Sequence, residues 1–380
     1  MDRAKAIQGI KNASPVRFIP SDYLKKGPIP GIGLCLSGGG YRAMLFHLGA
    51  LLHLNDAGIL GRLDRISSVS GGSIAAAYLG LRWNRLEFKG GIATRFVPMV
   101  VEPLKRLASH TLDAPCVAKG MLKPGVASRH LADSLDRLIF KGATLQDLPD
   151  EGEGPRIILN ATNTLTGNLW RFSRRDMADH LLGRIPNPRI RLSQAVAASA
   201  AFPPFLSPAR LPVDPKDFVR DKSSKFPEAS LPSEVLLTDG GVYDNLGLEM
   251  VWKKYRTVLV SDAGNRIRYE PRQGSNFVSH TLRAVEIMQA QASSLRKRQL
   301  LEAFRRRLDG HSGAYWSITA SLTDYGVKEP LPFPREESER LSQIPVRLTK
   351  LDRRTAEHLV EWGRVLCKAS INRHFTRKLS

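Results

Sequence analysis

The chain has 380 residues, of which 57 are Lys or Arg and 36 are Asp or Glu, so its formal net charge is +21. Hydrophobic residues make up 42% and charged residues 24%, a composition typical of a globular protein and not of a disordered or fibrous one. The three cysteines, Cys35, Cys116 and Cys367, are far apart, which excludes a disulfide scaffold and a cysteine zinc site.

The N-terminal residues contain no apolar run of the kind that forms the centre of a signal peptide. No stretch has about 18 consecutive apolar residues, so no transmembrane helix is expected. Together with the cysteine usage, these features predict a cytoplasmic protein. The excess of positive charge predicts an anionic partner, and composition allows either nucleic acid or a negatively charged membrane surface.

In chain order, the first predicted elements alternate between strand and helix. Residues 31–37 form a short apolar run typical of a buried strand, and a helix follows in which Leu45, Leu48 and Leu52 share one face. A second strand is predicted at 65–69 and a second helix at 71–81. Each strand passes into its helix through glycines, an alternation typical of a parallel α/β sheet.

The middle of the chain is less regular. Residues 86–150 contain prolines at 98, 103, 115 and 124 between short amphipathic pieces and are expected to form a helical insertion or lid over the sheet. The proline-rich segment 207–233 is predicted to be a surface loop. Further strands are predicted at 156–163, 169–173, 234–241 and 257–264.

The last third of the chain is predicted to be mainly helical. A long helix is expected over 276–308, with Val278, Leu282 and Val285 facing inward, and a final helix over 353–372 after a proline-rich stretch. We expect a single domain spanning 1–380. Its parts are a core at about 28–320, the insertion at about 86–150 and a basic helical C-terminal part at about 276–380.

Three consecutive glycines, Gly38 to Gly40, stand between the first strand and its helix. Glycines there leave backbone N–H groups uncovered and directed at one point, which favours binding of an anion or oxyanion. A dinucleotide fingerprint is excluded by Leu36, and a Walker A loop by Tyr41 after the last glycine. A plain tight turn is the alternative interpretation.

Ser70 follows the second strand and is itself followed by Gly71 and Gly72. Such a serine, on a sharp turn at the start of a helix, resembles a nucleophile elbow, in which small neighbours let the hydroxyl project. The helix dipole there favours developing negative charge. A simple N-cap is the alternative.

Asp239 lies at the end of a predicted apolar strand and is followed by Gly240 and Gly241. In open α/β sheets such strand ends border the ligand crevice, and a carboxylate beside a serine can accept the proton of its hydroxyl. Taken by itself, the segment is better explained as an Asp-Gly turn after a strand.

In this order the motifs resemble those of the patatin-like phospholipase family. Members of this family carry a G-G-G-x-R/K-G oxyanion block, a G-x-S-x-G nucleophile block, an A-S-x-A-x-P block and a D-G-G/A block. The corresponding residues here are 38–42, 68–72, 198–203 and 239–241. Two departures involve small residues: Ala43 stands where the first block usually ends in glycine, and Ser68 replaces the first glycine of the second block.

The resemblance implies a three-layer α/β/α hydrolase with a mainly parallel central sheet and helical insertions, acting without a cofactor or metal. It implies a Ser–Asp dyad in which Ser70 attacks an ester carbonyl and Asp239 accepts the proton of its hydroxyl. The expected activity is that of a phospholipase A or lysophospholipase, which cleaves carboxylic esters of lipids. Backbone N–H groups of Gly38, Gly39 and Gly40 would stabilise the oxyanion, with support from Arg42, Gly71 and Gly240.

A Ser-Asp-His triad is the rival mechanism, and His280, His311 or His358 is the candidate histidine. None of the three follows a strand in a glycine-rich turn. The nine histidines are scattered and form no H-E-x-x-H motif, so no metal site is predicted.

The segment 276–308 carries a local net charge of +5, and a basic amphipathic helix commonly lies on anionic membranes. We therefore expect peripheral contact with an anionic membrane and a phospholipid or other acyl-ester substrate. One alternative is a weakly active or non-catalytic lipid-binding or regulatory protein that keeps the fold. The other is a basic nucleic-acid-associated protein, but the sequence has no recognisable nucleic-acid-binding motif to support it.

Overall fold

The computed structural model describes residues 27–113, 125–220, 224, 226–264, 277–327 and 332–375, and for residues 277 and 278 the backbone alone. Cys116 and the side chain of Val278 lie outside this part of the chain. Cys35 and Cys367 are buried free thiols. None of the described helices combines the length and the hydropathy that a bilayer span requires.

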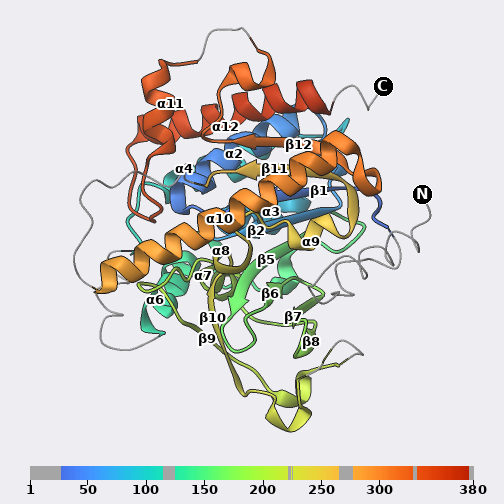
Figure 1. Ribbon diagram of the computed structural model, residues 1–380, viewed down its shortest axis with the longest axis vertical. Helices are drawn as coiled ribbons and strands as arrows, with labels where there is room; N and C mark the ends of the chain where they lie inside the picture. Colours follow the sequence, from blue (N-terminus) through green and yellow to red (C-terminus); the bar gives the residue numbers. More distant parts are fainter. Residues whose placement is uncertain are drawn as a thin grey trace, which may run out of the picture.

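The central sheet has ten strands among the described residues and is mixed; the glycine loop and Ser70 follow parallel strands, and Asp239 ends an antiparallel one (Figure 1). The neighbouring parallel strands are, in spatial order, β12 (Ser312–Ser317), β11 (Tyr255–Asp262), β1 (Ile29–Leu36), β2 (Arg65–Val69) and β5 (Arg156–Asn163). The antiparallel strands are β6 (Leu169–Phe172), β7 (Asp176–Asp179), β8 (Gly183–Pro186), β9 (Ala209–Pro212) and β10 (Glu234–Asp239).

Strands β2 and β10 approach each other end to end along one edge of β5. Val69 of β2 pairs with Asn160 in the parallel direction, and Asp239 of β10 pairs with the next residue, Ala161, in the antiparallel direction. The other edge of β5 is occupied by β6. The C-terminal residues of β2 and β10 therefore meet at one point of the sheet.

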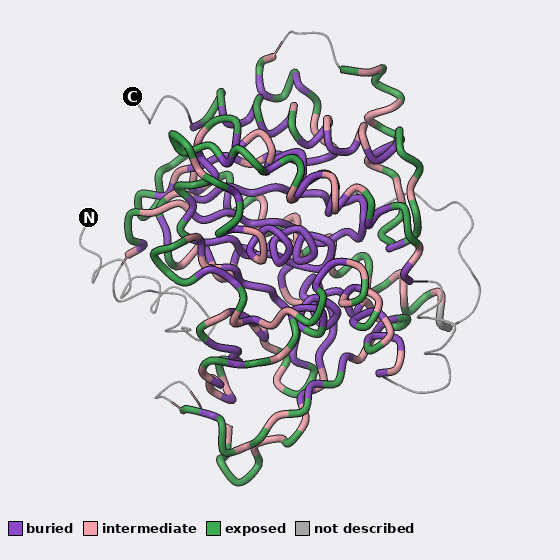
Figure 2. The backbone as a smooth tube through the Cα atoms, turned by 180° about the vertical axis from the view of Figure 1, so that it is seen from behind, coloured by how far each residue is buried: buried purple, intermediate pink, exposed green. Residues whose placement is uncertain are grey.

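Two hydrophobic clusters on opposite faces of the sheet make the fold a three-layer α/β/α sandwich. In β1, Leu34 and Leu36 belong to the larger cluster and Cys35 to the smaller one, as the two-residue period of a strand requires. Buried residues fill the middle of the molecule (Figure 2). The larger cluster contains residues from Leu34 to Phe375. The single domain expected from the sequence stays a prediction.

The helices divide between the two faces. The larger cluster is covered by α2 (Gly40–Asp56), α3 (Gly71–Arg82), α7 (Leu192–Ser199) and α12 (Arg353–His374). The smaller cluster is covered by α9 (Glu249–Trp252) and α10 (Phe277–Arg306), and α10 crosses the front of the sheet in Figure 1. Two further short α-helices are α8 (Gly241–Asp244) and α11 (Arg335–Ser342). The short 3₁₀ helices are η2 (Leu60–Arg62), η3 (Trp83–Arg85), η6 (Leu145–Asp147), η7 (Pro215–Asp217), η8 (Glu228–Ser230), η9 (Leu308–Gly310) and η10 (Leu322–Tyr325).

The expected insertion at 86–150 contributes to the core as well as covering it. Its described elements are the hairpin β3 (Phe88–Lys89) and β4 (Ile92–Ala93), the π-helices η4 (Val97–Val101) and η5 (Asp136–Phe140), and the helices α4 (Glu102–Leu107) and α6 (Val126–Leu135). Leu104, Leu131 and Phe140 are buried in the larger cluster. Pro98 and Pro103 occupy first turns, where the missing N–H is not needed, so they do not stop these helices.

The predicted strands and long helices are present, and the differences lie in weaker elements. The sequence analysis gave no strand at β7, β8 or β12, and β9 lies inside the segment predicted to be a loop. In α10, Leu282 and Val285 are only half-buried; the buried side chains are Leu300 and Ala303, nearer its C-terminal end. The inward face of this helix was therefore placed wrongly along its length.

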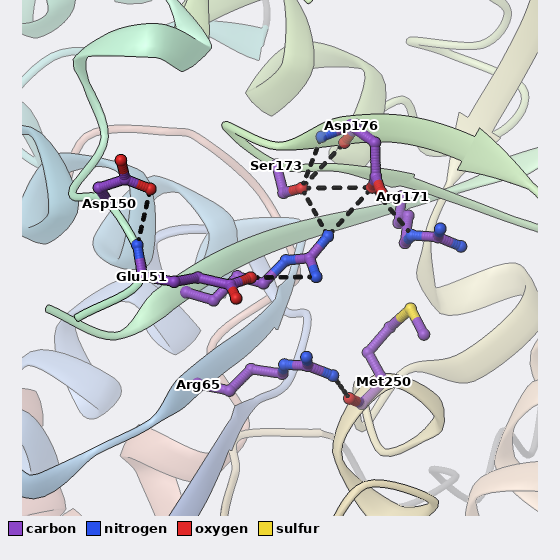
Figure 3. A network of polar contacts seen from close by, with 8 residues as sticks. Arg65, Asp150, Glu151, Arg171, Ser173, Asp176 and Met250 are labelled. Atoms are coloured by element: carbon purple, nitrogen blue, oxygen red, sulfur yellow. Dashed lines mark hydrogen bonds and ion pairs between the residues drawn. The ribbon is translucent and has the colours of Figure 1, made fainter. Parts of the chain in front are cut away.

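A polar network closes the junction between the parallel and antiparallel strands (Figure 3). Arg156 of β5 forms ion pairs with Glu151 at 3.2 Å and with buried Asp176 of β7 at 3.1 Å. Arg171 of β6 reaches the same Asp176 oxygen at 3.3 Å. Arg65 at the start of β2 donates to the Met250 carbonyl oxygen at 2.6 Å. These contacts join β5, β6 and β7, and the buried carboxylate of Asp176 would be left uncompensated without its arginine partners.

Helices α2 and α12 cross with their backbones in contact. A Cβ at Gly49 would lie 1.8 Å from the Val360 carbonyl oxygen, and one at Gly363 would lie 1.9 Å from that of Phe46. No side chain larger than hydrogen fits either position while the helices keep this separation.

We expect Gly363→Ala to lower the free energy of unfolding by about 1–3 kcal/mol, because the added methyl group forces α12 away from α2. The measurement is thermal or urea unfolding followed by circular dichroism. Glu361→Ala, on the exposed side of α12, is the matched control and should change stability by less than about 0.5 kcal/mol. Equal stabilities of wild type and Gly363→Ala would contradict the close crossing.

Candidate active site

Ser70 lies at the junction of β2 and α3 in a backbone conformation that is rare for a residue with a side chain, with φ 51° and ψ −120°. The turn is tight because α2 and α3 begin against each other. A Cβ at Gly71 would lie 2.0 Å from the Gly40 carbonyl oxygen, and one at Gly72 would lie 2.6 Å from that of Leu36. The glycines after Ser70 thus permit the close packing that forces its strained turn.

Asp239 ends β10 and is 4% exposed. The Ser70 side chain lies near this carboxylate and lowers its pKa. Asp239 Oδ1 accepts a hydrogen bond from the Gly241 N–H at 2.7 Å. A Cβ at Gly240 would lie 2.3 Å from the Asn160 carbonyl oxygen, so this glycine permits close contact with β5. The end-to-end meeting of β2 and β10 thus brings the predicted serine and aspartate together.

Burial dominates the electrostatics of Asp239. Desolvation raises the pKa of its carboxyl group from 3.8 to about 6, against the opposing effects of the Gly241 N–H and the Ser70 side chain. The group is ionised at neutral pH and is a stronger base than an exposed carboxylate.

The glycine loop has two N–H groups available and one engaged. Gly39 (φ 146°) and Gly40 (φ 60°) adopt conformations that favour glycine, and no acceptor in the described part of the chain takes their N–H groups. The Gly38 N–H instead donates to the Asn245 carbonyl oxygen at 3.1 Å. The structure therefore disagrees with a Gly38 N–H directed at an oxyanion. A Cβ at Gly38 would lie 2.5 Å from Asn245 Oδ1 and 3.3 Å from Ser70 Cβ, so this residue gives the serine side chain room.

Arg42, which the resemblance assigns to support of the oxyanion, is fully buried below the glycine loop. Its Nη2 donates to the Ala263 carbonyl oxygen at 2.7 Å, and its Nη1 donates to that of Ile344 at 2.5 Å. The neighbouring Tyr41 N–H donates to the Arg347 carbonyl oxygen at 3.0 Å. These contacts join the loop to the end of β11 and to the segment 342–348.

His47 is a buried residue near the site to which the sequence analysis gave no role. Its Nε2 lies 2.8 Å from the Ser37 carbonyl oxygen and its Nδ1 lies 2.7 Å from Ser261 Oγ. A carbonyl oxygen only accepts, so Nε2 carries the proton and Nδ1 accepts from the Ser261 hydroxyl. Burial lowers the pKa of His47 to about 4, so the ring is neutral at physiological pH and holds the residue preceding the glycine loop.

The three histidines of the rival triad lie in other environments. His280 is exposed on α10. His311, at the other end of the parallel strands, stacks on Trp252 with ring centroids 3.9 Å apart. His358 Nδ1 contacts Glu337 Oε1 at 2.6 Å. In the described part of the chain none of them contacts Ser70 or Asp239, and no three His, Cys, Asp or Glu side chains there gather as metal ligands.

Two comparisons with known sequences found a match. The family model described as Patatin-like phospholipase matches residues 34–252. The Saccharomyces cerevisiae protein named "Putative meiotic phospholipase SPO1" is 41% identical over 71 residues, which are 18% of this chain and 11% of that protein.

Two solved structures share the fold. Human GIVD cytosolic phospholipase A2 has a TM-score of 0.53 at 13% identity, over 96% of this chain and 63% of that chain. The same human enzyme in complex with methyl gamma-linolenyl fluorophosphonate has a TM-score of 0.50 at 14% identity, over 90% and 58% of the two chains. The chain thus spans less than two thirds of the length of either protein it matches. Since the family match covers more than half of the chain and includes the glycine loop, Ser70 and Asp239, the protein belongs to the patatin-like phospholipase family.

Proposed function

We propose that the protein is a lipid acyl hydrolase of the phospholipase A or lysophospholipase type, which cleaves carboxylic esters through an acyl-enzyme at Ser70. One observation carries the proposal: the Ser70 side chain lies near the buried carboxylate of Asp239, and no acceptor in the described part of the chain takes the N–H groups of Gly39 and Gly40. Family membership supports a lipid ester as the substrate. So does the fluorophosphonate bound to the human enzyme, which carries a linolenyl chain.

The first half of the reaction forms the acyl-enzyme. Ser70 Oγ attacks the ester carbonyl carbon while Asp239 takes the hydroxyl proton, and the carbonyl oxygen becomes an oxyanion. The N–H groups of Gly39 and Gly40 would donate to that oxygen, each such donor contributing roughly 10²–10³ to the rate. The carbonyl then re-forms, the ester C–O bond breaks, and Asp239 gives its proton to the departing alcohol oxygen.

The second half releases the fatty acid. A water molecule gives a proton to Asp239 as its oxygen attacks the acyl carbon on Ser70. The Oγ–acyl bond then breaks and the proton passes to Ser70 Oγ, which restores the starting state. This sequence requires one base and no histidine, in agreement with the surroundings of Asp239.

The contacts of α10 bear on the proposed contact with an anionic membrane. Two of its cations are tied to buried carboxylates: Arg296 to Asp244 at 3.6 Å and Lys297 to Asp262 at 2.6 Å. Others pair within the helix, as Arg305 does with Glu302. Its exposed face carries large apolar side chains, with Met288 63% and Leu295 60% exposed. We infer that α10 contacts a bilayer through these apolar side chains and that its cations contribute less than the sequence suggests.

We expect Ser70→Ala and Asp239→Asn each to reduce the release of fatty acid from phospholipid vesicles by at least about 10²–10⁴-fold, the usual contribution of a positioned base or nucleophile. Ser70→Ala should also abolish covalent labelling by an alkyl fluorophosphonate, detected by mass spectrometry. The matched control is His280→Ala, which should keep wild-type activity.

Undiminished hydrolysis by Ser70→Ala would refute the assigned nucleophile. A wild-type protein that binds vesicles but releases no fatty acid and takes no label would favour the non-catalytic lipid-binding alternative.

The pH dependence follows from the raised pKa of Asp239. Below about pH 6 the carboxyl group holds a proton and accepts none from Ser70, so kcat/KM should fall tenfold per pH unit there and level off above. The measurement is the initial rate of hydrolysis of a soluble ester between about pH 4.5 and 8.5, a range that includes the pKa of Asp239. A rise centred near pH 7 that a histidine substitution removes would instead indicate a histidine base.

For membrane contact, we expect the double variant Met288→Ser, Leu295→Ser to lose at least about tenfold in partitioning onto anionic vesicles, because two apolar side chains no longer leave water. Vesicle co-sedimentation at low and high salt measures this. Ile92→Ser, in the exposed β3–β4 hairpin, is the matched control. Binding that disappears in high salt but is unchanged in the double variant would assign docking to charge alone.

A further inference from the structure

Four serines form a buried chain of hydrogen bonds behind the predicted nucleophile. The Ser70 N–H donates to Ser199 Oγ at 2.9 Å. Ser199 Oγ lies 2.8 Å from Ser73 Oγ, which lies 3.0 Å from Ser68 Oγ, and the Ser68 hydroxyl donates to the Ile158 carbonyl oxygen at 3.1 Å. The side chains of Ser68, Ser73 and Ser199 are inaccessible to solvent.

The chemistry of the two ends sets the direction of the whole chain. The Ile158 carbonyl oxygen only accepts, so the single hydroxyl proton of Ser68 is used there. Ser73 must then donate to Ser68, and Ser199 must donate to Ser73. Ser199 Oγ is left as an acceptor, which is what the Ser70 N–H requires. In this buried chain every hydroxyl donates one hydrogen bond and accepts one, so its orientation is unique.

The backbone around Ser199 also holds the base. The Gly240 N–H donates to the Ser199 carbonyl oxygen at 3.2 Å, and the Asp239 N–H donates to that of Ala201 at 2.9 Å. The segment 199–201 therefore binds the main chains of both Ser70 and Asp239. A shift of this segment alters the separation of the two side chains.

We propose that Ser199 is a positioning residue for the reaction: its hydroxyl fixes the strained main chain of Ser70 so that the nucleophile faces Asp239. The inference rests on the proposed function, because it assigns a role within that same reaction. Without the acceptor at Ser199, the Ser70 N–H would be buried and unpaired, and the peptide would be free to rotate away from its φ of 51°. Oγ would then point away from the base. Substrate binding does not depend on this contact, so the effect belongs in kcat and not in KM.

The test compares Ser199→Ala, Ser199→Thr and the control Ser193→Ala on a soluble p-nitrophenyl ester. Ser193 is equally buried on the same helix, but its hydroxyl takes no part in the chain. We expect Ser199→Ala to lower kcat about 10- to 100-fold with KM within about twofold of wild type, the usual consequence of a misplaced reacting group. Ser199→Thr, which keeps the hydroxyl, should recover most of kcat, and Ser193→Ala should behave as wild type.

Wild-type kcat in a folded Ser199→Ala variant would overturn the proposal, as would a loss confined to KM or an equal loss in Ser193→Ala. If Ser199→Ala does not fold, Ser199→Cys takes its place, because a thiol fills the site but accepts hydrogen bonds weakly. A fall in kcat then supports the proposal and an unchanged kcat overturns it.

Failure of the proposed function gives a different result, because the wild type itself would then neither hydrolyse the ester nor take the fluorophosphonate label. Amide hydrogen exchange still tests the contact in that case. The segment 66–74 should exchange faster in Ser199→Ala than in Ser193→Ala, and equal exchange would overturn the role of Ser199.

Discussion

The structure depends on keeping one carboxylate charged although it is almost fully shielded from water. The rise in the pKa of Asp239 from 3.8 to about 6 means that its ionised form costs about 3 kcal/mol at neutral pH, even after the stabilising effect of the Gly241 N–H and the Ser70 side chain. The carboxylate stays in this buried position only because the surrounding backbone prevents it from moving into solvent. The meeting of β2 and β10 on one edge of β5 fixes Asp239 from the sheet side, and the backbone of segment 199–201 fixes it from the helical side.

The glycine loop has a different requirement. The N–H groups of Gly39 and Gly40 can bind an oxyanion only if no protein group accepts their hydrogen bonds. Gly39 and Gly40 can remain open because their neighbours are held firmly: the Gly38 N–H by Asn245, Tyr41 by Arg347 and the Arg42 guanidinium by two carbonyl oxygens. Neutral His47 adds a further contact to the Ser37 carbonyl oxygen. Each of these hydrogen bonds restricts the backbone of the loop, so the N–H groups of Gly39 and Gly40 are held in position before a ligand binds.

Local pattern predicted β2 and β5 to the residue and placed Ser70 and Asp239 at strand ends, because alternation, glycine turns and apolar runs are short-range signals. It did not predict β7 or β12, whose residues are largely polar or small and become strands only through neighbours. Local pattern also could not predict the hydrogen-bond partners of Gly38, Arg42 and Ser70, because each contact joins residues more than 100 positions apart. The charges of α10 were counted correctly, but their pairing with Asp244 and Asp262 depends on the folded sheet.

The support of the glycine loop by the segment 342–348 has a consequence for the order in which the protein matures. A chain emerging from the ribosome presents Gly40 and Ser70 early, but the carbonyl oxygens of Ile344 and Arg347 arrive some 300 residues later. Until then Arg42 lacks one of its acceptors and the N–H groups of the loop lack their fixed frame. The nucleophile is therefore synthesised long before the surroundings that would activate it. The glycine loop therefore takes its final form only after residues 342–348 have been added to the growing chain.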